Sequence, residues 1–180
     1  MADETLNKVL LPENVCFGCG HENPNGLKIE IERDPDNDDR LIGTFNPTNY
    51  MIGFPGITHG GAIYTALDCM AFWTPTVLRS EMKVFWILRS ANIKYVRPAH
   101  EGKLLSLSGW IEKEGTHVDF ALVRTEARDE KGRLLTEAKF EVVPLALDKF
   151  KKVAGIEELP ENWCGLIKKT NKPNIYIDIR

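Results

Sequence analysis

Residues 56–75 carry the groups best able to do chemistry. Asp68 is the only charged side chain between His59 and Arg79, and its neighbours in the sequence are apolar. A carboxylate in apolar surroundings must find hydrogen bonds or shift its pKa, and such groups are frequent at functional sites. An Asp that pairs with the backbone or with an arginine, and only orders the core, would produce the same pattern. The sequence alone leaves both interpretations of Asp68 open.

The same stretch is predicted to form one buried helix. Apolar residues recur at helical spacing, namely Ile63, Ala66, Leu67, Met70 and Trp73. Thr58 is expected to cap the helix, and Pro75 is expected to end or kink it. After His59, Gly60 and Gly61 bring bare backbone N–H groups to the helix start, a place that favours negative charge.

Gly61, Thr65, Asp68 and Phe72 share one stripe of this helix. At a rise of ~1.5 Å per residue, Asp68 lies roughly 10 Å along the helix from the Gly61 amide. One reacting carbonyl cannot easily reach both, because a donor or a base must lie within about 3 Å of its target. If two copies of the helix packed antiparallel, the Gly61 end of one would face Asp68 of the other. We therefore predict a site shared between the two chains of a homodimer.

The elements around the helix are predicted to be strands. Apolar and polar residues alternate at 27–32 and again at 41–45, before the helix. Four long strands are expected after it, at 84–98, 103–112, 118–128 and 134–142, and a change of apolar phase in the third is what a bulge would produce. An apolar helix needs cover on most sides, which predicts an α+β domain whose curved antiparallel sheet wraps around it.

The domain is expected to span residues 16–145. Residues 1–15 are predicted to form an arm with little to bury, and residues 146–180 an extension that packs on the surface.

Composition limits the function classes. The chain has 180 residues and a net charge of −3, with well-mixed charges and no basic run, which argues against nucleic acid as a partner. It has no apolar run long enough to span a bilayer, and its first residues are too polar for a signal peptide. A cytoplasmic location without membrane association is expected.

Four cysteines are present, at Cys16, Cys19, Cys69 and Cys164. Cys16 and Cys19 form a C-x2-C pair, which is half of many zinc sites, but no second pair follows and only Cys164 is a distant candidate. No thioredoxin-like pattern surrounds the pair either. We therefore expect no metal site and no disulfide, and interpret residues 16–26 as a glycine-rich turn before the first strand.

Three segments, in this order, resemble the hotdog-fold acyl-CoA thioesterases, in particular their phenylacetate-pathway (PaaI-like) branch. They are C-F-G-C-G-x-x-N-P-x-G-L at 16–27, G-x-x-H-G-G-A-I-x-x-x-L-D at 56–68 and N-I-K-Y-V-R-P at 92–98. The second is the most specific, because the family places an acidic residue nine positions after the His, as His59 and Asp68 are placed. The resemblance covers residues 16–144 and implies the hotdog fold.

The resemblance also implies an activity. The amide of Gly61, with Gly60, would polarise the thioester carbonyl, His59 would orient the turn, and Asp68 of the partner chain would attack the carbonyl or activate water. No metal or redox cofactor is then required, and coenzyme A enters only as part of the substrate. The implied assembly is a homodimer, which in this family can pair further into a tetramer.

Candidate substrate-binding residues are Thr65, Phe72, Ser90 and Arg97. Arg97 is placed to meet coenzyme A phosphates, although such a residue could equally be the solvated face of a strand. Ser90 is considered because a Thr or Ser that positions water in related enzymes is replaced by Leu88, and a catalytic Asn of another branch is replaced by Gly53.

Two other functions stay open. A non-catalytic acyl-CoA sensor or carrier would share the fold and the pocket, whereas a hotdog dehydratase is disfavoured because its Asp-x4-His pattern is missing. The acyl group is not determined either. Five aromatic residues could line an acyl pocket or simply fill the core: Tyr64, Phe72, Trp73, Phe85 and Trp86.

Overall fold

The structure is a computed structural model and describes residues 5–170. Its helices are α1 (Leu6–Leu10), α2 (Gly60–Leu78), α3 (Leu147–Ala154) and α4 (Glu161–Thr170), and short 3₁₀ turns lie at Asn49–Met51 and Ser80–Met82. Its strands are β1 (Glu30–Arg33), β2 (Arg40–Phe45), β3 (Ile52–Phe54), β4 (Ile57–Thr58), β5 (Phe85–Tyr95), β6 (Leu105–Glu114), β7 (Ala121–Arg128) and β8 (Leu134–Leu145).

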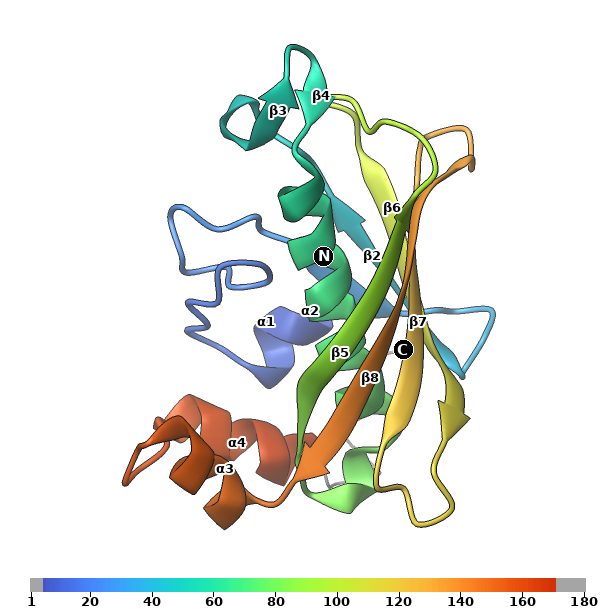
Figure 1. Ribbon diagram of the computed structural model, residues 1–180. Coiled ribbons are helices and arrows are strands. Elements are labelled where there is room, and N and C mark those ends of the chain that lie inside the picture. Colours follow the sequence, from blue (N-terminus) through green and yellow to red (C-terminus); the bar gives the residue numbers. More distant parts are fainter. Residues whose placement is uncertain (1–4, 171–180) are drawn as a thin grey trace.

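Six strands form one antiparallel sheet in the order β1-β2-β6-β7-β8-β5. The sheet curves along α2, which lies on its inner face (Figure 1). Leu67, Met70 and Trp73 of α2 are fully buried against it, and every second residue of β7 is buried. The prediction of a curved antiparallel sheet around one long helix is confirmed. The predicted alternation of apolar and polar residues is also confirmed, since Leu27 and Ile29 are buried, although β1 itself begins at Glu30.

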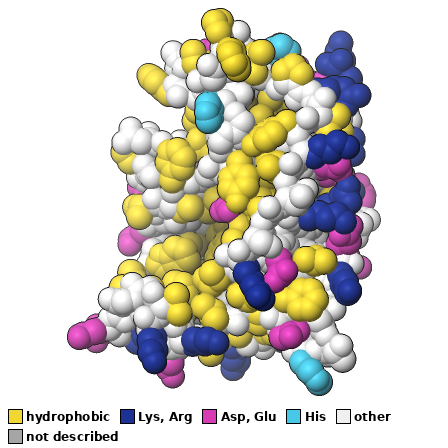
Figure 2. Space-filling model, in the orientation of Figure 1, with side chains coloured by type: hydrophobic (Ala, Val, Ile, Leu, Met, Phe, Trp, Pro, Cys, Tyr) yellow, Lys and Arg dark blue, Asp and Glu magenta, His cyan; other side chains and the backbone are white. Residues whose placement is uncertain are grey.

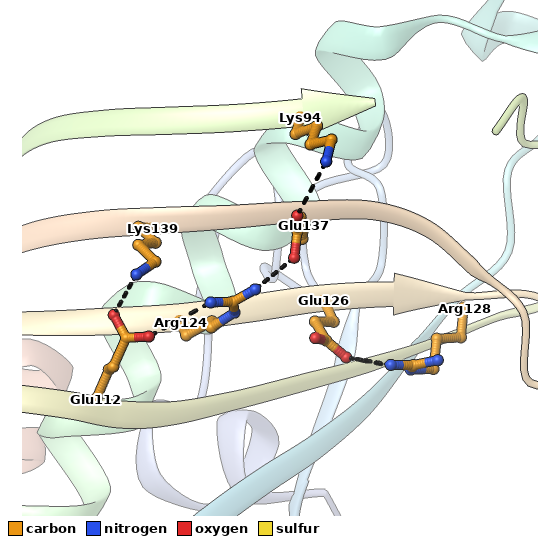
Figure 3. A network of polar contacts seen from close by, with 7 residues as sticks. All are labelled: Lys94, Glu112, Arg124, Glu126, Arg128, Glu137 and Lys139. Atoms are coloured by element: carbon orange, nitrogen blue, oxygen red, sulfur yellow. Dashed lines mark hydrogen bonds and ion pairs between the residues drawn. The ribbon is translucent and has the colours of Figure 1, made fainter. Parts of the chain in front are cut away.

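The outer face of the sheet carries cross-strand ion pairs. Arg124 on β7 lies between Glu112 on β6, at 3.3 Å, and Glu137 on β8, and Lys139 reaches Glu112 at 2.7 Å (Figure 3). Exposed pairs of this kind are each worth at most about 1 kcal/mol. They nonetheless show which face of β6, β7 and β8 is directed away from α2.

The ends of α2 differ from the prediction. The N-cap is His59 rather than Thr58, which lies in the short strand β4. Pro75 neither ends nor interrupts the helix, which continues to Leu78. Threonine hydroxyls on both sides of it donate to carbonyls of the preceding turn, Thr74 to Met70 O at 2.6 Å and Thr76 to Phe72 O at 2.7 Å. These bonds supply donors in the turn where proline has no N–H.

Residues 1–15 were expected to have little to bury, and for the described part this is wrong. Leu6, Leu10 and Leu11 are buried, and the buried side chain of Asn7 makes three hydrogen bonds. It donates to Cys19 O at 2.9 Å and to Ile29 O at 3.0 Å, and accepts from the Ile31 N–H at 3.1 Å. The sequence did not show this because α1 has only five residues, too few for a visible helical period.

Two further expectations are corrected. The change of apolar phase in 118–128 is not a bulge but the end of the turn before Ala121. Register shifts lie elsewhere along β7, in its pairing with β6 between Ile111 and Lys113 and in its pairing with β8 between Ala127 and Arg128. The segment after β8 packs on the surface as expected, but as the helices α3 and α4, with Leu166 buried; residues 171–180 lie outside the described part.

Within residues 5–170, none of the helices combines the length and the apolar character that a membrane crossing requires.

Candidate active site

The start of α2 opens into a pocket of about 430 Å³. His59 and Gly60 lie on its wall, opposite Tyr95 and Arg97 of the segment around the end of β5. The backbone of His59 is extended, which turns the chain from β4 into the helix. The site therefore has a helix N-terminus, with its positive dipole end, on the wall of an accessible pocket.

Tyr95 fixes the start of the helix. Its hydroxyl donates to the Gly60 carbonyl at 3.0 Å, and its ring lies so close that a Cβ on Gly60 would approach it to 3.2 Å. Glycine at this position therefore lets the end of β5 pack directly on the first turn of α2. The third resemblance motif contains Tyr95, but this contact between strand and helix could not be read from the sequence.

The two glycine amides are not equivalent. The Gly61 N–H donates to Nδ1 of His59 at 2.9 Å, so the amide expected to be the main donor already has an acceptor. The same bond leaves the ring proton of a neutral His59 on Nε2. Among the described residues no acceptor is found for the Gly60 N–H. Gly60 is therefore the amide that a ligand in this pocket can use.

Asp68 lies in a second pocket, of about 350 Å³, whose walls also include Phe72, Trp86 and Leu88. The carboxylate is half-buried, and within residues 5–170 it has no hydrogen bond or ion pair. Burial raises the pKa of Asp68 to about 6, and the nearby Cys16 adds to the shift. The structural alternative, an Asp held by the backbone or by an arginine, is therefore not what the described residues show.

The predicted site residues are thus divided between two places. His59, Gly60 and Arg97 line the pocket at the helix start, whereas Asp68 and Phe72 line the other.

The remaining candidates line neither pocket. The Thr65 hydroxyl donates to Gly61 O at 2.9 Å, and exposed Ser90 lies on β5 opposite Glu141. Of the five aromatic residues, Trp73, Phe85 and Trp86 are core, Tyr64 packs on Phe140 with ring centroids 5.7 Å apart, and Phe72 and Trp86 also face the Asp68 pocket.

Sequence reasoning missed several neighbours of Asp68. Cys16 and Cys19 of the N-terminal loop, Cys69 of α2 and Trp163 of α4 all line its pocket. The C-x2-C pair was visible, but nothing in its spacing connected it with Cys69. Trp163 lies in the segment 146–180, which was predicted only to form an extension.

Comparison with known proteins supports the fold. Residues 55–136 match the thioesterase superfamily profile. No curated protein matches the sequence.

Solved structures resemble this one. A thioesterase from Haemophilus influenzae superposes with a TM-score of 0.62 at 17% identity, covering 72% of this chain and 86% of its own. A hypothetical thioesterase with coenzyme A from Streptococcus pneumoniae gives 0.56 at 18% identity, covering 66% and 89%. The E. coli PaaI protein of the phenylacetic acid degradation operon gives 0.53 at 14% identity, covering 67% and 81%. At such identities the likeness shows the fold, and the fold is the hotdog fold.

Proposed function

We propose that this protein is an acyl-CoA thioesterase, which hydrolyses the thioester of an acyl- or aroyl-CoA to the free acid and coenzyme A. The observation that carries the proposal is that α2 bears two unpaired polar groups, each beside a pocket. They are the half-buried carboxylate of Asp68 and the Gly60 N–H, for which the described residues offer no acceptor. A free carboxylate serves as base or nucleophile, and a free amide at a helix N-terminus stabilises a developing oxyanion. The superfamily match over residues 55–136 supports the coarser part of the proposal, the activity of a thioesterase.

The two groups are proposed to meet across a homodimer. Gly60 and Asp68 are eight residues apart, which is about 12 Å along the helix axis, and they line different pockets. A single acyl carbonyl cannot contact both groups of one chain. Antiparallel packing of two copies of α2 would instead bring Gly60 of one chain to Asp68 of the other, giving two equal sites per dimer.

Strand β5 supports this arrangement. It is an edge of the sheet, eleven residues long, and most residues of its second half are exposed. A long unpaired edge readily accepts another strand. In Figure 2, hydrophobic side chains run down the centre of the face on which α2 and β5 lie in Figure 1. The exposed residues include Tyr95 at the end of β5 and Phe54 in β3. Pairing of β5 with its own copy would continue the sheet and cover these groups.

In the proposed reaction the substrate carbonyl oxygen accepts a hydrogen bond from the Gly60 N–H. Asp68 of the partner subunit removes a proton from water as the water oxygen bonds to the carbonyl carbon. The tetrahedral intermediate then breaks its C–S bond, coenzyme A leaves as a thiolate that takes up a proton, and the acid is released. Alternatively the carboxylate bonds to the carbonyl carbon first and water hydrolyses the resulting anhydride. Label in Asp68 after a single turnover in ¹⁸O-water would identify the second route, with water attacking the Asp68 carbon of the anhydride, since the first route places label only in the released acid.

Arg97 is proposed to bind the phosphates of coenzyme A. It lines both the pocket at the helix start and an adjoining one of about 400 Å³. This adjoining pocket is also lined by Lys103, Lys131 and Arg133. The guanidinium of Arg97 is held in place by a bond to Leu134 O at 2.7 Å. Lys103 and Arg133 pair with Glu130 and Asp129 of the same pocket. Arg97 and Lys131, for which the described residues show no carboxylate partner, are therefore the cations proposed to meet the phosphates of a ligand whose thioester lies at the helix start.

The proposal is tested by thiol release from a panel of aromatic, short-chain and medium-chain acyl-CoA esters. Wild type is expected to turn over at least one member, and Asp68→Asn to lower kcat by about 10²–10⁴-fold, the usual worth of a general base. Asp119→Asn, at an exposed turn position, is the matched control and should match wild type. Normal turnover by a folded Asp68→Asn protein would remove Asp68 from the mechanism.

A non-catalytic acyl-CoA sensor is the second candidate, favoured by one observation. Leu88 lies on the wall of the Asp68 pocket, so this position offers no hydroxyl to hold a water molecule. Thermal stabilisation of the protein by acyl-CoA without any thiol release would identify the sensor.

A further inference from the structure

Three cysteines that are far apart in the sequence meet beside Asp68. The sulfurs of Cys16, Cys19 and Cys69 all lie within 4.8 Å of one another, and Cys16 and Cys69 are separated by 4.0 Å. Tetrahedral zinc with Zn–S bonds of ~2.3 Å requires sulfurs about 3.8 Å apart. The cluster therefore needs only a small contraction to enclose such an ion. The prediction of no zinc site considered Cys164 as the distant ligand, whereas the fold supplies Cys69.

The loop is shaped to deliver its two sulfurs to the helix. A Cβ on Gly18 would lie 2.2 Å from the Cys69 sulfur and 3.2 Å from the Thr65 side chain, so only glycine lets the loop approach α2 this closely. The Asn14 side chain accepts from the Cys16 N–H at 2.9 Å and fixes the start of the turn. These contacts orient the cysteines before any ion is bound.

Hydrogen-bond donors are directed at the sulfurs. The indole N–H of Trp73 lies 3.2 Å from the Cys19 sulfur, and the Asn14 amide lies 3.5 Å from it. Cysteines that only fill a core need no such donors, whereas N–H groups around the sulfurs are characteristic of bound thiolates.

Only one side of the cluster is accessible. Cys19 and Cys69 are buried, while half-buried Cys16 lies on the wall of the pocket that also contains Asp68 and Trp163. Three thiolates leave one of the four positions of zinc unfilled, and that position faces this pocket. Asp68 is not within the 4.8 Å group, so its carboxylate remains free for the role given to it above.

We propose that Cys16, Cys19 and Cys69 bind one zinc ion, whose fourth ligand is a water molecule from the pocket. On binding, the thiol protons leave to solvent and three thiolates coordinate the ion. The complex of Zn²⁺ with three thiolates carries one net negative charge. The ion joins the N-terminal loop to α2, and the proposal does not depend on the protein being a thioesterase.

The test is the metal content of the full chain, purified under reducing conditions without a chelator. Elemental analysis is expected to find about one zinc per chain in wild type, and at least about a tenfold lower content in Cys16→Ser and Cys69→Ser. Cys164→Ser is the matched control, because this cysteine lies outside the cluster with its sulfur near Leu159 O, and it should retain zinc. Cobalt reconstitution of wild type should give an intense thiolate-to-cobalt charge-transfer band.

A wild-type protein that neither retains zinc nor develops the cobalt band overturns the proposal, and so does unchanged zinc in folded Cys16→Ser. If the serine variants do not fold, the test is to remove zinc from wild type and from Cys164→Ser with a chelator. The proposal requires that both melting temperatures fall. An unchanged melting temperature contradicts it. Loss of two free thiols in wild type without a reductant, together with absence of zinc, would instead indicate a disulfide within the cluster and would contradict the proposal.

Discussion

Gly60 begins α2 and lines the pocket beside His59, which allows the role of one amide to be tested with little disturbance. Proline is well accepted at the first position of a helix, where its missing N–H has no partner in the helix. The backbone of His59, at φ −62° and ψ 133°, is already in the region that a following proline requires. Gly60→Pro should therefore fold while removing the proposed oxyanion donor.

We expect Gly60→Pro to lower kcat by about 10²–10³-fold, as loss of an oxyanion donor does. Gly60→Ala adds the same Cβ beside the Tyr95 ring but keeps the amide, so it should retain most of the activity. Steady-state kinetics of both variants, with circular dichroism as the folding check, make the comparison. Equal losses in the two variants would show that the crowding of Tyr95, and not the amide, is responsible.

Asp34 gives a pH-dependent contribution to stability. Its buried carboxylate accepts from the Asp36 N–H at 3.0 Å and pairs with Arg40, and these bonds lower its pKa. Because the folded-state pKa lies below the unfolded value, the stabilisation is present above the ordinary carboxyl pKa of about 3.9 and is lost as pH falls through the folded value. Asp34→Asn should cost about 1 kcal/mol of unfolding free energy at neutral pH.

The deficit of Asp34→Asn should shrink as pH falls below the ordinary carboxyl pKa of about 3.9, because the unfolded carboxyl is then protonated and the folded one follows at lower pH. Urea unfolding at neutral pH and near pH 3 measures the deficit, since about pH 3 lies within the range where the loss has begun. An equal deficit at both values would show that Asp34 acts through its shape and not through its charge.

At the scale of elements, the sequence predicted what periodicity encodes. The six sheet strands and α2 followed from alternation and helical spacing, because each has one face against a common core. The short helices α1, α3 and α4 were not predicted, since five to ten residues give few repeats of a helical pattern.

The site was only partly predictable for a related reason. Asp68, His59 and Gly60 stand out within one segment of the sequence. The hydrogen bond that occupies Gly61, the contact of Tyr95 with the helix start and the approach of Cys16 to Cys69 are created by packing between segments. No rule of spacing relates those segments to one another.

Helix α4 contributes a wall of the Asp68 pocket. Trp163 packs with its ring centroid 6.3 Å from those of Phe72 and Phe85. Trp163→Ala should lower the unfolding free energy by about 2 kcal/mol, less than for a fully buried tryptophan. It should also shift kcat/KM toward longer or bulkier acyl groups. Thermal unfolding and the acyl-CoA panel measure both effects, with exposed Val153→Ala as the control. An unchanged acyl preference would place the acyl group elsewhere.

At the scale of the whole molecule, the proposed sharing of the site between two chains predicts complementation between inactive chains. A heterodimer of Asp68→Asn and Gly60→Pro chains contains one site with both intact residues and one site with neither. Co-expression with two different tags and purification through both should therefore yield about half of the wild-type activity per dimer. Each homodimer should be nearly inactive.

If each site lay within a single chain, both sites of the heterodimer would carry one defect and no activity would return. Light scattering at the assay concentration provides the second check, because an active monomer excludes the shared site.

The strand order has a consequence for how the protein is made. On the ribosome, α2 and β5 emerge before β6, β7 and β8, yet β5 pairs in this sheet with β8, which ends at Leu145. Helix α2, the most apolar helix of the described chain, therefore lacks the complete sheet that buries it until most of the polypeptide has been synthesised. Sheets that depend on such distant pairing fold slowly and expose apolar surface meanwhile. The nascent helix α2 is thus the segment expected to need chaperone protection most during translation.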